Sequence, residues 1–268
     1  MSIGEVLDAG FRLYRLTLVR CLVLALLSVI VGQIPSAYDL AQGTLTLPLD
    51  EKSVTWWLLA AGSTALNIGV SVALFWRQWG VVSGRPATLG EDLATALRLW
   101  PSVFMTTILV LLLFVVPGVL IGVAWSSFDV MGRVLIIPWL VGVWVWVSLP
   151  AFMIVPVRLV EDLSPKDSLV RAFTLIRGSW WRSSAIFTIA VLVMLVFYTI
   201  GGLIGVLIAQ LVGSADLAVM TVVTTIITAI LGGIFVPFYT SITLVLLLEL
   251  RVRRGGADIA SRLSALAN

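Results

Sequence analysis

The 268-residue chain contains no histidine and a single cysteine, Cys21. It therefore has no imidazole for acid/base or metal chemistry near neutral pH, and it cannot form an intrachain disulfide. Charge is also scarce, because only 12% of the residues are Asp, Glu, Lys or Arg, whereas soluble domains usually carry about 25%. A water-soluble globule could not cover its surface with so few charges. The composition indicates an all-α, polytopic membrane protein.

Long stretches without any charged residue predict where the chain crosses the membrane. A transmembrane helix needs about 20 apolar residues, because the hydrocarbon core is about 30 Å thick and a helix rises about 1.5 Å per residue. The chain offers six such windows, at residues 21–38, 53–76, 99–128, 134–157, 183–215 and 217–248. We expect the short first window to use residues before it as well, and we expect a tight turn at residues 213–216 between the last two.

Two alternatives to six helical spans do not fit the windows. Barrel strands are about 9–11 residues long and alternate in polarity, whereas these windows are continuously apolar. A cleaved signal peptide would explain the arginines Arg12, Arg15 and Arg20 before the first window. However, no small-residue cleavage site follows that window, so we interpret it as a span.

The distribution of Lys and Arg predicts the orientation. With the N-terminus inside, every Lys and Arg except Lys52 and Arg133 lies on the inner side. Such an excess is typical of cytoplasmic loops. We therefore expect a bacterial cytoplasmic membrane protein with both termini in the cytoplasm.

Three inner segments share a helix-start pattern in which a hydroxyl residue is followed three positions later by an acid. The pairs are Ser2 and Glu5, Thr88 and Glu91, and Ser164 and Asp167. Apolar residues follow in each segment at helical spacing, and basic residues occupy the opposite face. This pattern predicts three amphipathic helices in the inner headgroup layer.

The same pattern indicates a threefold parallel repeat within one membrane domain over residues 1–268. The copies would cover residues 2–87, 88–163 and 164–250, followed by a short cytoplasmic tail at 251–268. Because each copy would hold two spans, the copies would be related by an axis along the membrane normal. The alternative is coincidence, since any six-span protein needs inner loops and such loops often contain basic helices.

Three stretches of the chain resemble a known family. The first, residues 156–182, contains PVRLVED (156–162) and SLVRAFTLIRGSWWR (168–182). The second is LELRVRRGGAD at 248–258, and the third is IGEVLDAGFRLY at 3–14. They are similar to the membrane domain that precedes the catalytic domain in some bacterial glycerophosphodiester phosphodiesterases. The resemblance implies a stand-alone six-helix module, because the chain has no room for a catalytic barrel of roughly 250 residues. It implies no catalytic residue.

Small and polar residues form stripes within the predicted spans. Such stripes allow close helix packing with interhelical hydrogen bonds, and this is the interpretation that we favour. The alternative is that they line a cavity. Two stripes are candidates for cavity lining: Ser63, Asn67 and Ser71, and Thr221, Thr224, Thr225 and Thr228. Gly201 and Gly205 form a GxxxG motif. Prolines within the spans predict kinks, and a broken helix at residues 232–237 is the alternative there.

The basic inner segments are the candidate functional surface. Arginines beside a bilayer attract anionic lipid, and the candidates for contact with lipid headgroups or an acidic partner protein are Arg12, Arg15, Arg98, Arg171, Arg177 and Arg182. The positive-inside bias alone is the alternative explanation.

We expect a non-enzymatic scaffold or accessory subunit without cofactor, metal or nucleic-acid partner. The alternative is a permease-like subunit for a lipid or hydrophobic solute, working with a separate ATPase. Ion-coupled transport is disfavoured, because no charge lies within the six windows. A membrane-embedded enzyme is the weakest hypothesis.

Overall fold

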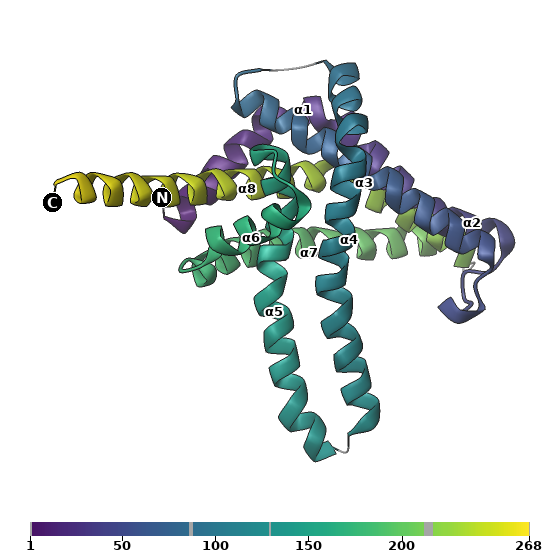
Figure 1. The fold of residues 1–268 in the computed structure, drawn as a ribbon. Coiled ribbons are helices and arrows are strands. Elements are labelled where there is room, and N and C mark those ends of the chain that lie inside the picture. Colours follow the sequence, from purple (N-terminus) through teal and green to yellow (C-terminus); the bar gives the residue numbers. More distant parts are fainter. Residues whose placement is uncertain (1, 86–87, 129, 212–216, 268) are drawn as a thin grey trace. The chain divides into compact units, whose positions relative to one another are not determined.

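The computed structural model describes residues 2–85, 88–128, 130–211 and 217–267, and the regular structure in these ranges is helical. Figure 1 shows the elements in order along the chain. They are α1 (Ile3–Gly32), α2 (Ile34–Gln42), the 3-10 turn η1 (Leu49–Glu51), α3 (Val54–Val82), α4 (Leu89–Ser127), α5 (Val130–Glu161), α6 (Pro165–Ile176), α7 (Trp180–Leu211) and α8 (Leu217–Ala267).

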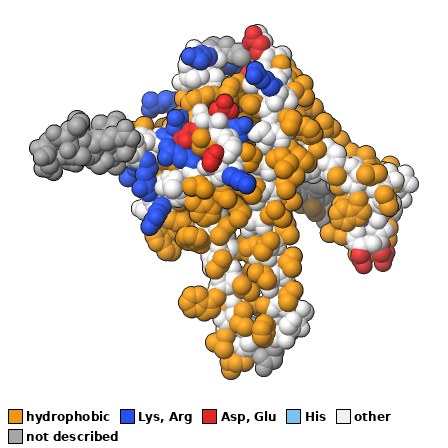
Figure 2. Space-filling view, viewed as in Figure 1, with side chains coloured by type: hydrophobic (Ala, Val, Ile, Leu, Met, Phe, Trp, Pro, Cys, Tyr) orange, Lys and Arg blue, Asp and Glu red, His pale blue; other side chains and the backbone are white. Residues whose placement is uncertain are grey.

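Six of these helices are long and apolar enough to cross a membrane, namely α1, α3, α4, α5, α7 and α8. Their surfaces are apolar too: Leu111 of α4 is 57% exposed and Trp139 of α5 is 80% exposed. Figure 2 shows hydrophobic side chains covering the hairpin of α4 and α5. Such a surface is unfavourable in water and suits hydrocarbon. The prediction of an all-α, multi-pass membrane protein is confirmed.

The predicted interface helices differ from the structure in one respect. The segment after Ser2 and the segment after Thr88 are the first turns of the long helices α1 and α4, and only the third is a helix of its own, α6. Nothing between Tyr14 and Cys21 breaks a helix, so α1 continues for 30 residues. By contrast, Gly178 adopts the left-handed φ of +83° just after α6, a conformation that ends helices.

The continuous α1 also corrects the first predicted span. This helix ends at Gly32, short of residue 38, and α2 begins at Ile34 with Pro35 in its first turn. Proline is accepted in a first turn, where its missing N–H would have no helical partner. The span therefore takes its length from residues before Cys21, as expected. The predicted turn at residues 213–216 lies outside the described residues.

The helix-start pattern is confirmed at all three positions. Ser2 Oγ accepts a hydrogen bond from Glu5 N at 3.2 Å, and Glu5 Oε2 accepts one from Ser2 N at 2.6 Å. Thr88 and Glu91 make the same reciprocal pair. In the third copy Ser164 Oγ accepts from Asp167 N at 3.2 Å but donates to Asp167 Oδ2 at 2.6 Å. The shorter aspartate side chain thus accepts a hydrogen bond from the Ser164 hydroxyl.

The chain divides into two compact units. The first consists of Met1–Val6, Pro101–Ile186 and Thr243–Asn268, and the second of Leu7–Trp100 and Phe187–Ile242. These boundaries do not coincide with those of the predicted repeats, which stay a prediction.

Glycines bring helices close together in the second unit. A Cβ at Gly205 of α7 would lie 2.9 Å from Thr224 Cγ2 of α8, and a Cβ at Gly201 would collide with Leu231. On α8 itself, a Cβ at Gly232 or Gly233 would collide with side chains of α1. The small residues therefore serve packing. The helix α8 is continuous through residues 232–237, so the structure contains no broken helix there.

A buried carboxylate holds the segment that joins α2 to α3. Asp39 is 7% exposed, and its oxygens accept hydrogen bonds from Lys52 Nζ at 2.8 Å, Thr44 Oγ1 at 2.7 Å and Trp56 Nε1 at 2.9 Å. Burial alone would raise the pKa of Asp39, but these donors together lower it below its ordinary value. Hydrogen bonds that favour the charged form have this effect.

The glycine contacts generate a prediction about α7. Gly205→Ala should destabilise the protein by about 1–3 kcal/mol, because its methyl group meets Thr224. Gly202→Ala is the matched control, since a Cβ there meets nothing within 4 Å. The measurement is the apparent melting temperature in detergent. Equal melting temperatures for the two variants would contradict close packing at Gly205.

The Asp39 contacts generate a prediction about pH. Because its folded pKa is lowered, the carboxylate stabilises the loop above the unfolded pKa of about 3.9, and this contribution is lost as the pH falls through the folded value. Hydrogen exchange over residues 43–56, corrected for intrinsic rates, should therefore increase in acid. Asp39→Asn should remove the protection already at pH 6, whereas the exposed Asp50→Asn should leave it unchanged. Unaltered protection in Asp39→Asn would show that the carboxylate does not hold the loop.

Candidate functional site

Arginines neutralise the carboxylates at several helix ends. In the second unit, Arg77 Nη1 lies 2.8 Å from Asp92 Oδ2, and the Asp92 side chain is 1% exposed. In the first unit, Glu161 at the end of α5 receives Arg171 Nε at 2.9 Å and Arg251 Nε at 3.1 Å. Buried acids need such partners, because an unpaired buried charge is strongly unfavourable.

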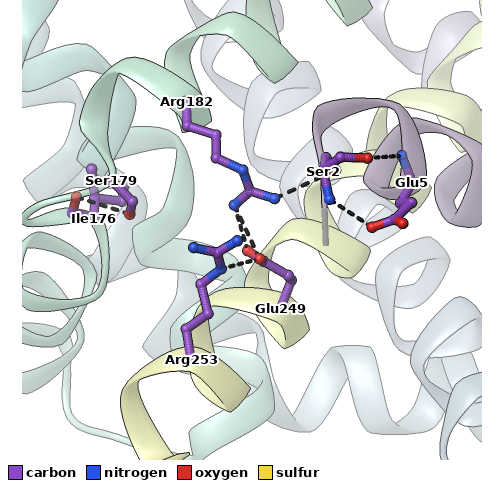
Figure 3. Close-up of polar contacts among 7 residues, drawn as sticks. All are labelled: Ser2, Glu5, Ile176, Ser179, Arg182, Glu249 and Arg253. Carbon is purple, nitrogen blue, oxygen red and sulfur yellow. Dashed lines mark hydrogen bonds and ion pairs between the residues drawn. The ribbon is translucent and has the colours of Figure 1, made fainter. Parts of the chain in front are cut away.

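Glu249 of α8 is also held by two arginines, as Figure 3 shows. Arg182 Nη1 lies 3.0 Å from both carboxylate oxygens of Glu249, and Arg253 Nε donates to Oε1. Arg182 Nη2 also reaches the backbone oxygen of Ser2 at 3.5 Å, which ties the start of α1 to the cluster. Two arginines of the described residues thus share one carboxylate.

The six arginines predicted to contact headgroups therefore fall into two groups. Arg171 and Arg182 are ion-paired with Glu161 and Glu249. The others are exposed and have no ion pair within the described ranges: Arg12, Arg15, Arg98 and Arg177. Arg15 lies over the Phe11 ring at 5.6 Å. Free guanidinium groups remain at these four positions.

A pocket of about 790 Å³ lies in the first unit beside α6. Its walls come from α4, α5, α6 and the start of α7, and most of them are apolar; they include Trp146, Pro150, Phe173 and Trp180. Arg177 and Gly178, which follow α6, complete the lining. The volume is within the about 300–1,000 Å³ range of small-molecule sites.

The sequence explains one wall of this pocket. Pro150 has no N–H, so the carbonyl of Trp146 one turn earlier has no helical donor. Trp180 Nε1 donates to that oxygen at 3.2 Å, and the rings of Trp146 and Phe173 lie 6.0 Å apart. A proline in α5 therefore positions an indole of α7 and connects two pocket walls.

A second pocket, of about 240 Å³, shares Arg177 and Gly178 with the first. Arg253 and Arg254 of α8 also line it, together with Ser179. The three arginines make this pocket cationic. A cationic pocket next to an apolar one can hold a ligand that has an anionic group and an apolar body.

The polar stripes have several roles. Ser28 Oγ of α1 donates to Asn67 Oδ1 of α3, and Ser63 and Thr224 donate to carbonyl oxygens of their own helices. Ser71 is exposed, and Thr228 is half-buried. Thr221 and Thr225 line a pocket of about 200 Å³ that α2 completes. Of the predicted cavity residues, the structure thus places these two in a pocket.

Sequence reasoning missed a buried polar cluster in the second unit. Gln78 is 0% exposed, and its Nε2 donates to Pro237 O at 2.8 Å and Ser241 Oγ at 2.9 Å, with Thr17 Oγ1 at 3.4 Å. The cluster joins α3 to α8 and α1. A glutamine at the end of a span and a proline within another are the available signals, but only the fold pairs them.

Sequence reasoning also missed the apolar pocket and two of the three arginines of its neighbour, Arg253 and Arg254. Within the described ranges no group of three or more Cys, Asp and Glu side chains is placed to hold a metal ion.

Comparison with known proteins adds no relative: no protein-family model, no curated protein and no solved structure matches the chain. The class of protein therefore follows from the structure alone: it is an all-helical, multi-pass membrane protein. The resemblance to the phosphodiesterase membrane domain stays a prediction that rests on its three sequence stretches.

Proposed function

We propose that this protein is a non-enzymatic scaffold or accessory subunit that binds anionic lipid of the cytoplasmic leaflet through unpaired arginines. The observation that carries the proposal is which arginines are bound to acids and which are not. Asp92, Glu161 and Glu249 are each already bound by arginine, so Arg12, Arg98 and similar residues have no acid partner within the described ranges. Each such residue near the surface contributes about 1 kcal/mol toward anionic lipid.

The proposed location is the bacterial cytoplasmic membrane, with both termini in the cytoplasm. The support is the distribution of Lys and Arg, all of which except Lys52 and Arg133 fall on one side of the six spans. Lys52 is bound to Asp39. The headgroup-binding arginines would then face the cytoplasmic leaflet, where anionic lipids concentrate.

A permease-like subunit is the second candidate. The pocket of about 200 Å³ lined by Thr221 and Thr225 favours it, because these threonines come from the polar stripe of a span. That volume is below the usual range for small-molecule sites, so we rank this function second. Co-purification of a nucleotide-binding protein with this chain would favour it over a scaffold.

The proposed orientation predicts the results of reporter fusions. Fusions within residues 40–50, 126–133 and 213–217 should report the outer side, and fusions within 77–98 and 158–182 should report the cytoplasm. The reason is that the Lys and Arg excess is retained inside during insertion. An outer location for 77–98 or 158–182 would refute the orientation.

The proposed function predicts lipid selectivity. The purified protein in detergent should retain phosphatidylglycerol in preference to phosphatidylcholine, and rising ionic strength should reduce that preference because salt screens exposed charges. Replacing Arg12, Arg15 and Arg98 together by Gln should reduce the preference severalfold. Native mass spectrometry measures both lipids at once, and equal retention of the two by the wild-type protein would rule the proposal out.

A further inference from the structure

We infer that the two adjoining pockets of the first unit form one specific site for a single anionic phospholipid. The arginine-lined pocket would take the phosphate, and the apolar pocket would take an acyl chain. This inference rests on the proposed function. It adds that one lipid molecule binds at a defined site, in addition to the general attraction of anionic lipid by exposed arginines.

The apolar pocket has the properties of a chain-binding site. It holds about 790 Å³, and residues of four helices line it. Aromatic side chains form a large part of its wall, and the hydrogen bond from Trp180 Nε1 to the Trp146 backbone oxygen keeps the Trp180 ring in place. A pocket of this composition has little to offer a polar solute, because a polar group buried there would lose its hydrogen bonds. It favours an apolar chain.

The smaller pocket has the properties of a phosphate site. Arg177 and Arg254 are exposed and have no ion pair within the described ranges, and the third arginine, Arg253, shares Glu249 with Arg182. The pocket is therefore strongly positive. Guanidinium groups match phosphate oxygens in a bidentate geometry, which makes arginine the preferred cation for this anion.

Gly178 connects the two pockets. It lines both, and its φ of +83° turns the chain sharply between α6 and α7. This turn places Arg177 at the boundary, so that one guanidinium borders both the apolar and the cationic volume. The lining thus changes from apolar to cationic at this boundary. An anionic phospholipid requires such a change, because its charged headgroup is joined directly to its apolar chains. A soluble anion would use only the smaller pocket.

The test titrates the full-length protein in detergent with phosphatidylglycerol and counts bound lipids by native mass spectrometry. The wild type should show one saturable site. Replacing Arg177 and Arg254 together by Gln should weaken that site about thirtyfold, since each arginine contributes about 1 kcal/mol toward anionic lipid. The matched control replaces the exposed Arg20 and Arg85 by Gln, which removes the same charge at residues that line neither pocket, and should leave the site intact.

A second variant tests the chain pocket without changing charge. Val170 lines the apolar pocket and is 62% exposed, so Val170→Trp should fill the pocket while the protein still folds. It should weaken the site at least tenfold. The control Val19→Trp, at a residue 83% exposed on α1, should not. Glycerol 3-phosphate, which carries the headgroup chemistry alone, should compete poorly.

The outcomes separate this inference from the proposed function. Equal weakening by the two arginine pairs, or no effect of Val170→Trp, would overturn the specific site while the preference for anionic lipid stands. Competition by glycerol 3-phosphate as strong as that of the lipid would overturn the lipid as occupant and leave a phosphate site. If the wild-type protein shows no preference for anionic lipid, both the proposed function and the specific site are refuted.

Discussion

Polar groups within the six long helices are stabilised by partners inside the protein, because the bilayer interior supplies none. This requirement accounts for the best-defined contacts in both units. In the first, Pro150 leaves the Trp146 carbonyl without a helical donor, and the Trp180 indole supplies one. In the second, the buried Gln78 amide donates to Pro237 O and so joins two spans. Pro150, which would weaken a soluble helix, here creates a place where another helix attaches.

The same requirement applies to charge and explains how the candidate site arises. Glu161 at the end of α5 and Glu249 within α8 each hold two arginines, which stabilises these largely buried acids. The chain has 17 basic and 14 acidic residues, and the ion pairs of the described ranges leave some of the arginines without an acid partner. Arg177 and Arg254 stay without an acid partner within the described ranges, and they lie beside the apolar pocket. The excess charge is thereby available to an external anion.

Helix packing follows from side-chain size and not from burial of apolar surface, since lipid is as apolar as the helices. Gly201 and Gly205 let α7 approach α8, and Gly232 and Gly233 let α8 approach α1. The GxxxG motif in the sequence predicts the contact of α7 with α8. The second contact has no comparable motif, and a glycine pair followed by a proline is compatible with a broken helix as well. Only the observed neighbours on α1 identify the pair as a packing surface.

Composition and the spacing of charges determined the helical class, the six spans and the helix starts at Ser2, Thr88 and Ser164, because these depend on local hydrophobicity and on bonds between residues three apart. Tertiary structure decided which arginines are paired and which are free. It also decided that Arg177, from the end of α6, and Arg254, from α8, share a pocket. These are contacts between residues distant in sequence, and they depend on how the helices of the first unit pack. No local pattern in the chain records that packing.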